Sequence, residues 1–183
     1  MAAGSVLVIA WRFSGEAPVF SPFLLPRPGA EAVYALALCA AVAFALNLAL
    51  RALLARSESI RQTAHDIHDW LGPRGWPELA LIAIASGIGE EFLFRGWLAN
   101  ETGIWISSIL FGIVHVPLNR NWVFWPVFAA ILGLGFAWLC VWTQTLLFAV
   151  ILHAAINFLN LRTAIRFVER TRDKPDSLPI PGA

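Results

Sequence analysis

Several polar side chains of the kinds that catalyse hydrolysis lie within otherwise apolar stretches of this sequence. They are Glu90, Glu91, Arg95, His115, His153 and Asn157. A carboxylate or an imidazole can accept a proton from water, and an imidazole or an amide can donate a hydrogen bond to an oxyanion. Together these groups can supply the base, the oxyanion donor and the acid that hydrolysis of an amide bond requires.

Helical geometry separates the two carboxylates. At 100° per residue, Glu91 and Arg95 lie one turn apart on the same face of a helix, whereas Glu90 points about a quarter-turn away. We therefore expect Glu91 and Arg95 to form an ion pair that holds the helix in register. Glu90 is then free to point into the interior, without a partner on its own helix.

The depth of these side chains along their helices also groups them. Glu90 lies about 18 Å along its helix from the turn that follows it, at 1.5 Å per residue. His115 lies about 20 Å from the same turn along the next helix, so the two residues are at a similar depth. Measured from the turn before the last helix, His153 lies about 14 Å deep and Asn157 about 20 Å deep, on one helix face. These four side chains are predicted to converge on one polar pocket.

The composition indicates that the solvent around these helices is lipid. The chain has 183 residues, of which 58% are hydrophobic and 14% charged, and its mean hydropathy is +0.69. A soluble domain of this size cannot bury so much apolar surface. The net charge of +1 and the absence of a strongly basic run argue against a nucleic-acid partner.

Apolar segments predict an all-α, polytopic bundle of about five transmembrane spans, since about 20 residues cross the hydrocarbon layer. The segments are 32–50, 79–99, 104–116, 122–142 and 145–161. Between the first two, residues 57–71 place Ile60, Ala64, Ile67 and Leu71 at helical spacing among charged residues. This pattern is typical of an amphipathic helix at the membrane interface.

The same segments divide the chain into four parts. They are an N-terminal extracytoplasmic or interfacial segment (1–29), the first span with the amphipathic helix (30–76), a catalytic intramembrane core (77–161) and a disordered cytoplasmic tail (162–183). Of the basic residues in the loops, only Arg12 and Arg27 precede the first span. The positive-inside rule therefore places the N-terminus outside and the C-terminus in the cytoplasm of a cell or inner membrane.

Ionised groups inside the membrane are expensive. Each costs roughly 2.5 to 3.5 kcal/mol at a helix centre, so the span carrying Glu90, Glu91 and Arg95 cannot face lipid alone. A single membrane His or Asn usually just hydrogen-bonds a neighbouring helix, and Phe111 alone is simply a packing residue. The combination at one depth is what indicates a functional site.

Three short motifs occur in order on successive helices. Residues 90–95 have the form E-E-x-x-x-R, residues 111–115 have F-x-x-x-H, and residues 153–157 have H-x-x-x-N. The ordered set resembles the CPBP family of intramembrane proteases (CAAX-processing and bacteriocin-processing enzymes, also called abortive-infection proteins), which includes the type II CAAX prenyl endopeptidases. The resemblance covers residues 77–161, with fewer helices before the core than many relatives have.

The resemblance implies an all-helical core that hydrolyses a peptide bond in a membrane-associated protein or peptide. Glu90 matches the catalytic glutamate and His115 its partner in activating water, while His153 and Asn157 match the positions that stabilise the oxyanion. Glu91, Arg95 and Phe111 are supporting residues. The sequence does not reveal the substrate.

A metal ion is an open alternative. Glu90, His115 and His153 form an acceptable zinc ligand set, but no H-E-x-x-H motif is present, and a glutamate–histidine pair can activate water unaided. We favour a metal-independent mechanism.

Other functions also remain open at this stage. Ser86, one turn before Glu90, suggests a serine nucleophile. His115 and His153 could ligate a haem from both sides. The polar residues could instead fix the packing of a non-catalytic membrane partner, such as an immunity or scaffold protein.

Overall fold

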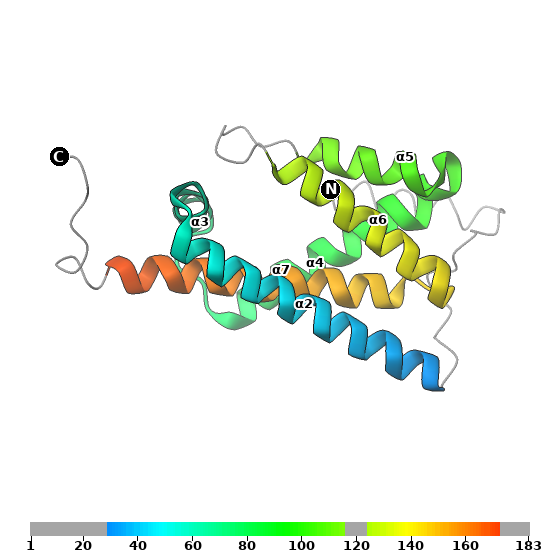
Figure 1. Cartoon of the computed structure of the whole chain (residues 1–183), viewed down its shortest axis with the longest axis horizontal. Coiled ribbons are helices and arrows are strands. Elements are labelled where there is room, and N and C mark those ends of the chain that lie inside the picture. The colour runs from blue at the N-terminus through cyan, green and yellow to red at the C-terminus, as the bar shows by residue number, and fades with distance from the viewer. Residues whose placement is uncertain (1–28, 116–123, 173–183) are drawn as a thin grey trace.

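The described part of the chain is helical. A computed structural model describes residues 29–115 and 124–172, and these residues contain no β-strand. The elements are α2 (Ala30–Arg56), α3 (Glu58–Leu71), α4 (Trp76–Glu91), the π-helix η1 (Phe92–Leu98), α5 (Ala99–Val114), α6 (Trp125–Thr143) and α7 (Leu147–Arg172) (Figure 1). The predicted all-α bundle is confirmed.

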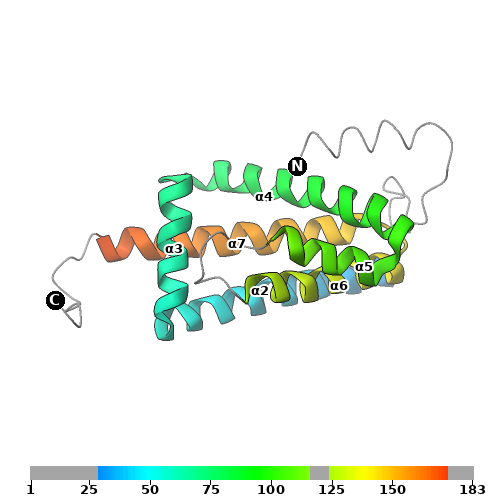
Figure 2. The same cartoon turned by 90° about the horizontal axis from the view of Figure 1, so that it is seen from above.

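Four helical stretches among the described residues are long and apolar enough to cross a membrane: Ala30–Arg56, Trp76–Val114, Trp125–Thr143 and Leu147–Arg172. The chain reverses direction within the second stretch at Gly103, whose φ of 81° lies in the left-handed region that glycine readily adopts. As a result, α5 returns along the bundle in the direction opposite to α4 (Figure 2). The predicted span 79–99 and residues 104–114 of the predicted span 104–116 lie in this stretch.

The outer surface of these helices is apolar. Large side chains such as Val33, Leu81 and Ile131 are more than half exposed. Exposed apolar surface on this scale requires a hydrocarbon environment. The chain is therefore an integral membrane protein.

The amphipathic helix predicted at residues 57–71 is present as α3, which lies across one end of the bundle (Figure 2). Ser57 caps its N-terminus by accepting a hydrogen bond from the backbone N–H of Ile60 (3.4 Å). Ala64 is buried against Leu54 and Val168. At the other end of α3, a hydrogen bond from Arg172 (2.8 Å) lowers the pKa of the exposed Asp69.

The last helix is longer than predicted. Residues 162–172, expected to be part of a disordered tail, continue α7 to Arg172, so this part of the prediction is wrong. The reason is packing: Ala164, Ile165 and Val168 are buried, and two of them contact the cluster around α3. The N-terminal residues 1–28, including Arg12 and Arg27, and the remaining tail 173–183 lie outside the described residues.

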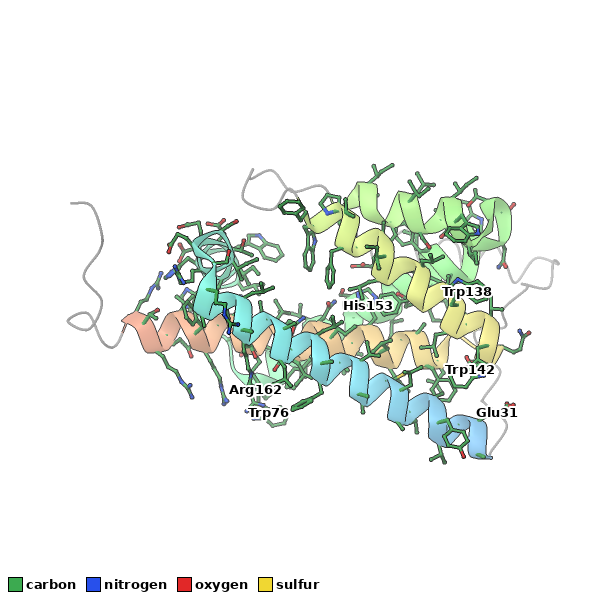
Figure 3. All side chains as sticks on the ribbon, in the orientation of Figure 1. Glu31, Trp76, Trp138, Trp142, His153 and Arg162 are labelled. Carbon is green, nitrogen blue, oxygen red and sulfur yellow. The ribbon has the colours of Figure 1, made fainter. Side chains whose placement is uncertain are left out.

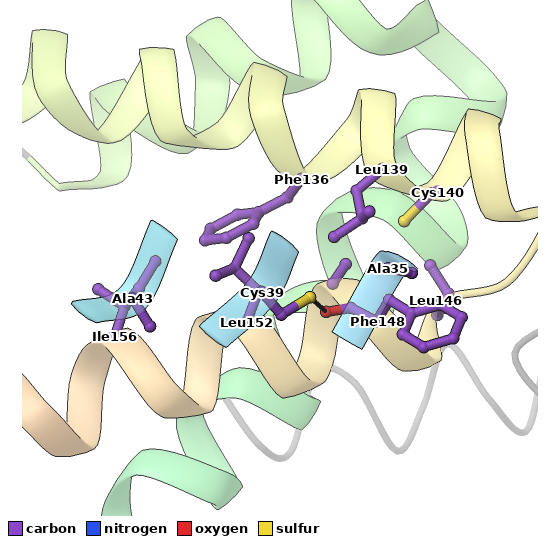
Figure 4. Packing of buried hydrophobic residues seen from close by; sticks show 11 residues of the cluster. Ala35, Cys39, Ala43, Phe136, Leu139, Cys140, Leu146, Phe148, Leu152 and Ile156 are labelled. Carbon is purple, nitrogen blue, oxygen red and sulfur yellow. Dashed lines mark hydrogen bonds between the residues drawn. The ribbon is translucent and has the colours of Figure 1, made fainter. Parts of the chain in front are cut away.

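The central helix of the bundle is α7, which packs against α2, α3, α4 and α6. Its apolar face forms a core with α2 and α6 (Figure 4), made of Ala35, Cys39, Ala43, Phe136, Leu139, Cys140, Leu146, Phe148, Ala149, Leu152 and Ile156. Both cysteines are free and buried there, as packing residues.

Two glycines set the distances between the helices that carry the polar residues. A Cβ atom at Gly87 of α4 would lie 3.1 Å from the backbone nitrogen of Ala154 on α7. One at Gly112 of α5 would lie 2.5 Å from the carbonyl oxygen of Pro126 on α6. Small residues allow membrane helices to approach this closely, so the short polar side chains beside them can meet.

Candidate active site

The helix that carries the first motif changes its winding within that motif. It is α-helical to Glu91 and π-helical from Phe92 to Leu98. Glu91 and Arg95 are both completely buried, and Arg95 Nη1 donates to Glu91 Oε1 at 3.0 Å. The predicted ion pair is confirmed. A π-helical turn within an α-helix is rare and is frequently found at functional sites.

Aromatic rings enclose the Arg95 guanidinium. Its central carbon lies 4.4 Å from the ring centre of Phe111 and 5.2 Å from that of Phe136. The guanidinium is thus stabilised by the faces of the rings and by one carboxylate. A Cβ atom at Gly133 would lie 2.8 Å from Arg95 Nη2, so only glycine leaves room for this arrangement. Phe111 is a supporting residue because it covers a buried charge.

Glu91 also orients His153. The Nδ1 atom of His153 lies 2.8 Å from Glu91 Oε1. An ionised carboxylate only accepts hydrogen bonds, so Nδ1 carries the proton and donates it. The ring stacks on Phe136 with 5.0 Å between centres and 9° between planes, in the interior between α7 and α6 (Figure 3). These contacts direct the other nitrogen, Nε2, toward Glu90.

His115 is oriented in the same way by a different acceptor. Its Nδ1 atom lies 2.6 Å from the carbonyl oxygen of Phe111, which can only accept, so Nδ1 again donates. Its Nε2 atom faces Glu90 Oε2 at 3.5 Å, and His153 Nε2 faces the same oxygen at 3.8 Å. Both distances exceed that of a good hydrogen bond. The carboxylate oxygen therefore sits between two imidazole nitrogens without a direct bond to either.

The second oxygen of Glu90 is held by a hydroxyl. Ser86 Oγ donates to Glu90 Oε1 at 3.1 Å and accepts from Asn157 Nδ2 at 3.0 Å. Asn157 therefore joins Glu90 through Ser86 rather than by direct contact. The four predicted side chains Glu90, His115, His153 and Asn157 do come together, from α4, the end of α5 and α7.

Exposure divides the site into two halves. The side chains of Glu91 and Arg95 are 0% exposed, whereas those of Glu90 and His115 are 9% and 21% exposed. Glu90 is still a buried residue, and its Oε2 atom has almost no contact with solvent, so His115 is the most exposed of these four side chains. The completely buried pair Glu91 and Arg95 is suited to holding geometry.

Two residues of the site are not predicted from the sequence in the roles that the structure shows. The sequence suggests Ser86 only as a nucleophile, although its position one turn before Glu90 predicts contact with that carboxylate. Phe136, which stacks on His153, gave no signal because it is one of many apolar residues in α6. Ser86 hydrogen-bonds to a carboxylate and an amide, and among the described residues it makes no hydrogen bond to a histidine, so the structure does not favour a serine nucleophile with a histidine base.

The positions of the side chains in the site can be compared with those that a metal ion or a haem would need. Among the described residues, no group of three His, Cys, Asp or Glu side chains is arranged to hold a metal ion. The metal-independent mechanism nevertheless remains a prediction. Glu90 Oε2 lies 3.5 and 3.8 Å from the two Nε2 atoms that would have to ligate the haem iron, so the positions of His115 and His153 do not favour a haem site.

Part of the chain is similar to a known protein family. Residues 72–159, which contain all three motifs, match the family model described as type II CAAX prenyl endopeptidase Rce1-like. This match covers slightly less than half of the 183-residue chain. The matched part is thus similar to the Rce1-like family, and the resemblance predicted from the motifs is confirmed.

A relative in Bacillus subtilis (strain 168) has the name "Uncharacterized protein YpbD". It is 30% identical over 106 residues, which cover 56% of this chain and 53% of the relative. The chain therefore aligns with about half the length of that protein. No solved structure matches the chain significantly.

The buried ion pair yields a prediction about stability. Replacing Glu91 by Leu leaves Arg95 charged, buried and without its carboxylate, so we expect the free energy of unfolding to fall by about 3 to 5 kcal/mol. Replacing Arg95 by Met as well removes the unpaired charge and should recover most of that loss. Thermal unfolding in detergent measures both variants.

The same two variants also distinguish an effect on the stability of the protein from an effect on the orientation of His153. Neither variant retains the carboxylate that orients His153, so the double variant should be stable but impaired in any reaction that uses His153. A double variant as unstable as Glu91→Leu would contradict the ion-pair interpretation.

Proposed function

We propose that this chain is an intramembrane endopeptidase that hydrolyses a peptide bond of a membrane-associated protein with water activated by Glu90 and His115. The single observation that carries the proposal is the position of Glu90 Oε2, which faces Nε2 of His115 at 3.5 Å and Nε2 of His153 at 3.8 Å. The family match supports peptide-bond hydrolysis as the reaction class.

Water activation follows from the acceptors at this point. A water molecule beside the Glu90–His115 pair can lie about 2.8 Å from Oε2 and from Nε2, a normal hydrogen-bond distance to each. Glu90 Oε2 accepts the proton as the water oxygen attacks the peptide carbonyl carbon, and His115 Nε2 holds the second hydrogen. Glu90 then returns the proton to the leaving amine.

His153 and Asn157 stabilise the oxyanion in this mechanism. His153 donates from Nε2 when it carries a second proton, and the adjacent Glu91 carboxylate compensates the resulting charge. Asn157 uses one N–H for Ser86 and has a second available for the substrate oxygen. Donors held in place before the reaction stabilise a developing oxyanion effectively, because they need no reorganisation.

The first test replaces the base. Glu90→Gln keeps the shape of the side chain but cannot accept the proton, so we expect cleavage to fall by about 100- to 10,000-fold. The measurement is cleavage of an internally quenched, farnesylated peptide with a C-terminal CAAX sequence by the full chain in proteoliposomes. Glu31→Gln, on the exposed start of α2, is the matched control and should leave cleavage unchanged.

The same variant addresses the substrate. If the wild-type chain does not cleave the farnesylated peptide, prenylated substrates are excluded. Membrane proteomes of cells with wild-type or Glu90→Gln protein then identify the uncleaved proteins that accumulate. Full activity of Glu90→Gln, or identical proteomes together with no peptide cleavage, would refute the proposed function.

We further propose that the reaction needs no metal ion, because the Glu90 and His115 pair can activate water by proton transfer alone. Active protein purified without added metal should contain far less than one equivalent of zinc by elemental analysis. Chelation with 1,10-phenanthroline should leave its activity unchanged. Activity lost on chelation and restored by zinc would overturn this part of the proposal.

The predicted orientation places the N-terminus outside and the C-terminus in the cytoplasm. It is supported by the basic residues at the end of the bundle where α3 lies, among them Arg56, Arg61, Arg170 and Arg172. A fluorescent protein fused after Ala183 should fluoresce, whereas alkaline phosphatase at that point should be inactive. Alkaline phosphatase inserted at the Gly103 turn should be active; the reverse pattern would invert the topology.

A further inference from the structure

We infer that Ser86 is a positioning residue of the reaction, holding Glu90 and Asn157 in their working orientations with one hydroxyl group. The inference rests on the proposed function, because it assigns Ser86 a role in that same site. Its effect is exerted through Glu90 and Asn157, without contact with the substrate.

The hydroxyl uses both of its hydrogen-bonding capacities. Ser86 Oγ donates to Glu90 Oε1 at 3.1 Å, and the same oxygen accepts from Asn157 Nδ2 at 3.0 Å. Ser86 and Glu90 belong to α4, whereas Asn157 belongs to α7. A hydroxyl combines a donor and an acceptor in one atom, so a single side chain joins the base to the oxyanion donor.

Each of these bonds fixes one functional orientation. With Oε1 bound to Ser86, the carboxylate of Glu90 can turn only Oε2 toward His115 and His153. With one N–H bound to Ser86, Asn157 has one N–H left for the oxyanion. Without the hydroxyl, Glu90 Oε1 loses its donor and the Asn157 amide can rotate.

The local packing explains why a short side chain is sufficient. Gly87 follows Ser86, and a Cβ atom at Gly87 would lie 3.1 Å from the nitrogen of Ala154 and 3.3 Å from the carbonyl oxygen of Val150. The backbones of α4 and α7 are thus in close contact next to Ser86. At this separation the serine hydroxyl reaches Asn157 directly.

A nucleophilic role for Ser86 is the alternative, since Glu90 could in principle accept its proton. The two roles predict different losses. A nucleophile is essential, so its removal should be as severe as Glu90→Gln and Ser86 should react with a fluorophosphonate probe. A positioning residue should leave a reduced but measurable rate with water as the nucleophile.

The experiment compares variants of the full chain in proteoliposomes with the farnesylated peptide, or with a peptide spanning the cleavage site of an accumulated protein. For Ser86→Ala we expect kcat to fall by about 10- to 100-fold, the effect of losing a hydrogen bond to a charged group, with KM changed less than about twofold. Ser86→Thr keeps the hydroxyl and should recover most of kcat. Ser86→Cys, a weak donor of similar size, should resemble Ser86→Ala.

The matched control is Ser108→Ala in α5. Ser108 is also buried in the bundle, but its hydroxyl donates only to the carbonyl oxygen of Ile104 in its own helix (2.6 Å). The Ser108→Ala substitution should therefore leave kcat unchanged. Thermal unfolding of every variant separates an effect on kcat from loss of the fold, and Ser86→Cys provides the comparison if Ser86→Ala does not fold.

The outcomes separate this inference from the proposed function. Full activity of folded Ser86→Ala or Ser86→Cys, beside an inactive Glu90→Gln, would overturn the role of Ser86 alone. A complete loss in Ser86→Ala with fluorophosphonate labelling of the wild type would replace positioning by nucleophilic catalysis. An active Glu90→Gln would remove the proposed function itself.

Discussion

The interaction on which the site depends is the pairing of Glu91 with Arg95 inside a hydrocarbon environment. Neither charge can reach water, and their contact at 3.0 Å compensates both. The pair has a second consequence, because Glu91 also accepts from His153 and Arg95 lies against Phe111. One buried ion pair thus connects three helices and sets the direction of the His153 imidazole.

This arrangement separates support from chemistry along a single helix. Glu91 is completely buried beside Arg95, whereas its neighbour Glu90, also buried, faces His115, which is partly exposed. Adjacent residues on a helix point about 100° apart, so two carboxylates next to each other can have different environments. The carboxylate that holds the ion pair is therefore separate from the carboxylate that we propose as the base.

The matched family segment, residues 72–159, begins before α4 and ends within α7. The helices α2 and α3 lie outside it, yet both pack on α7. Asn47 of α2 donates to the carbonyl oxygen of Leu159 and to Thr163 Oγ1 in α7. These contacts support the helix that carries His153 and Asn157, so the packing of the candidate site depends on elements outside the matched segment.

The sequence alone determined the helical class, the membrane environment, the amphipathic helix and the pairing of Glu91 with Arg95, because these follow from composition and from spacing within one helix. The convergence of Glu90, His115 and His153 was estimated from depth. Tertiary structure decided which atoms meet: it made Ser86 the link to Asn157, placed Phe136 on His153 and extended α7 through residues 162–172. Such contacts depend on the rotation and separation of neighbouring helices, which periodicity within one helix does not specify.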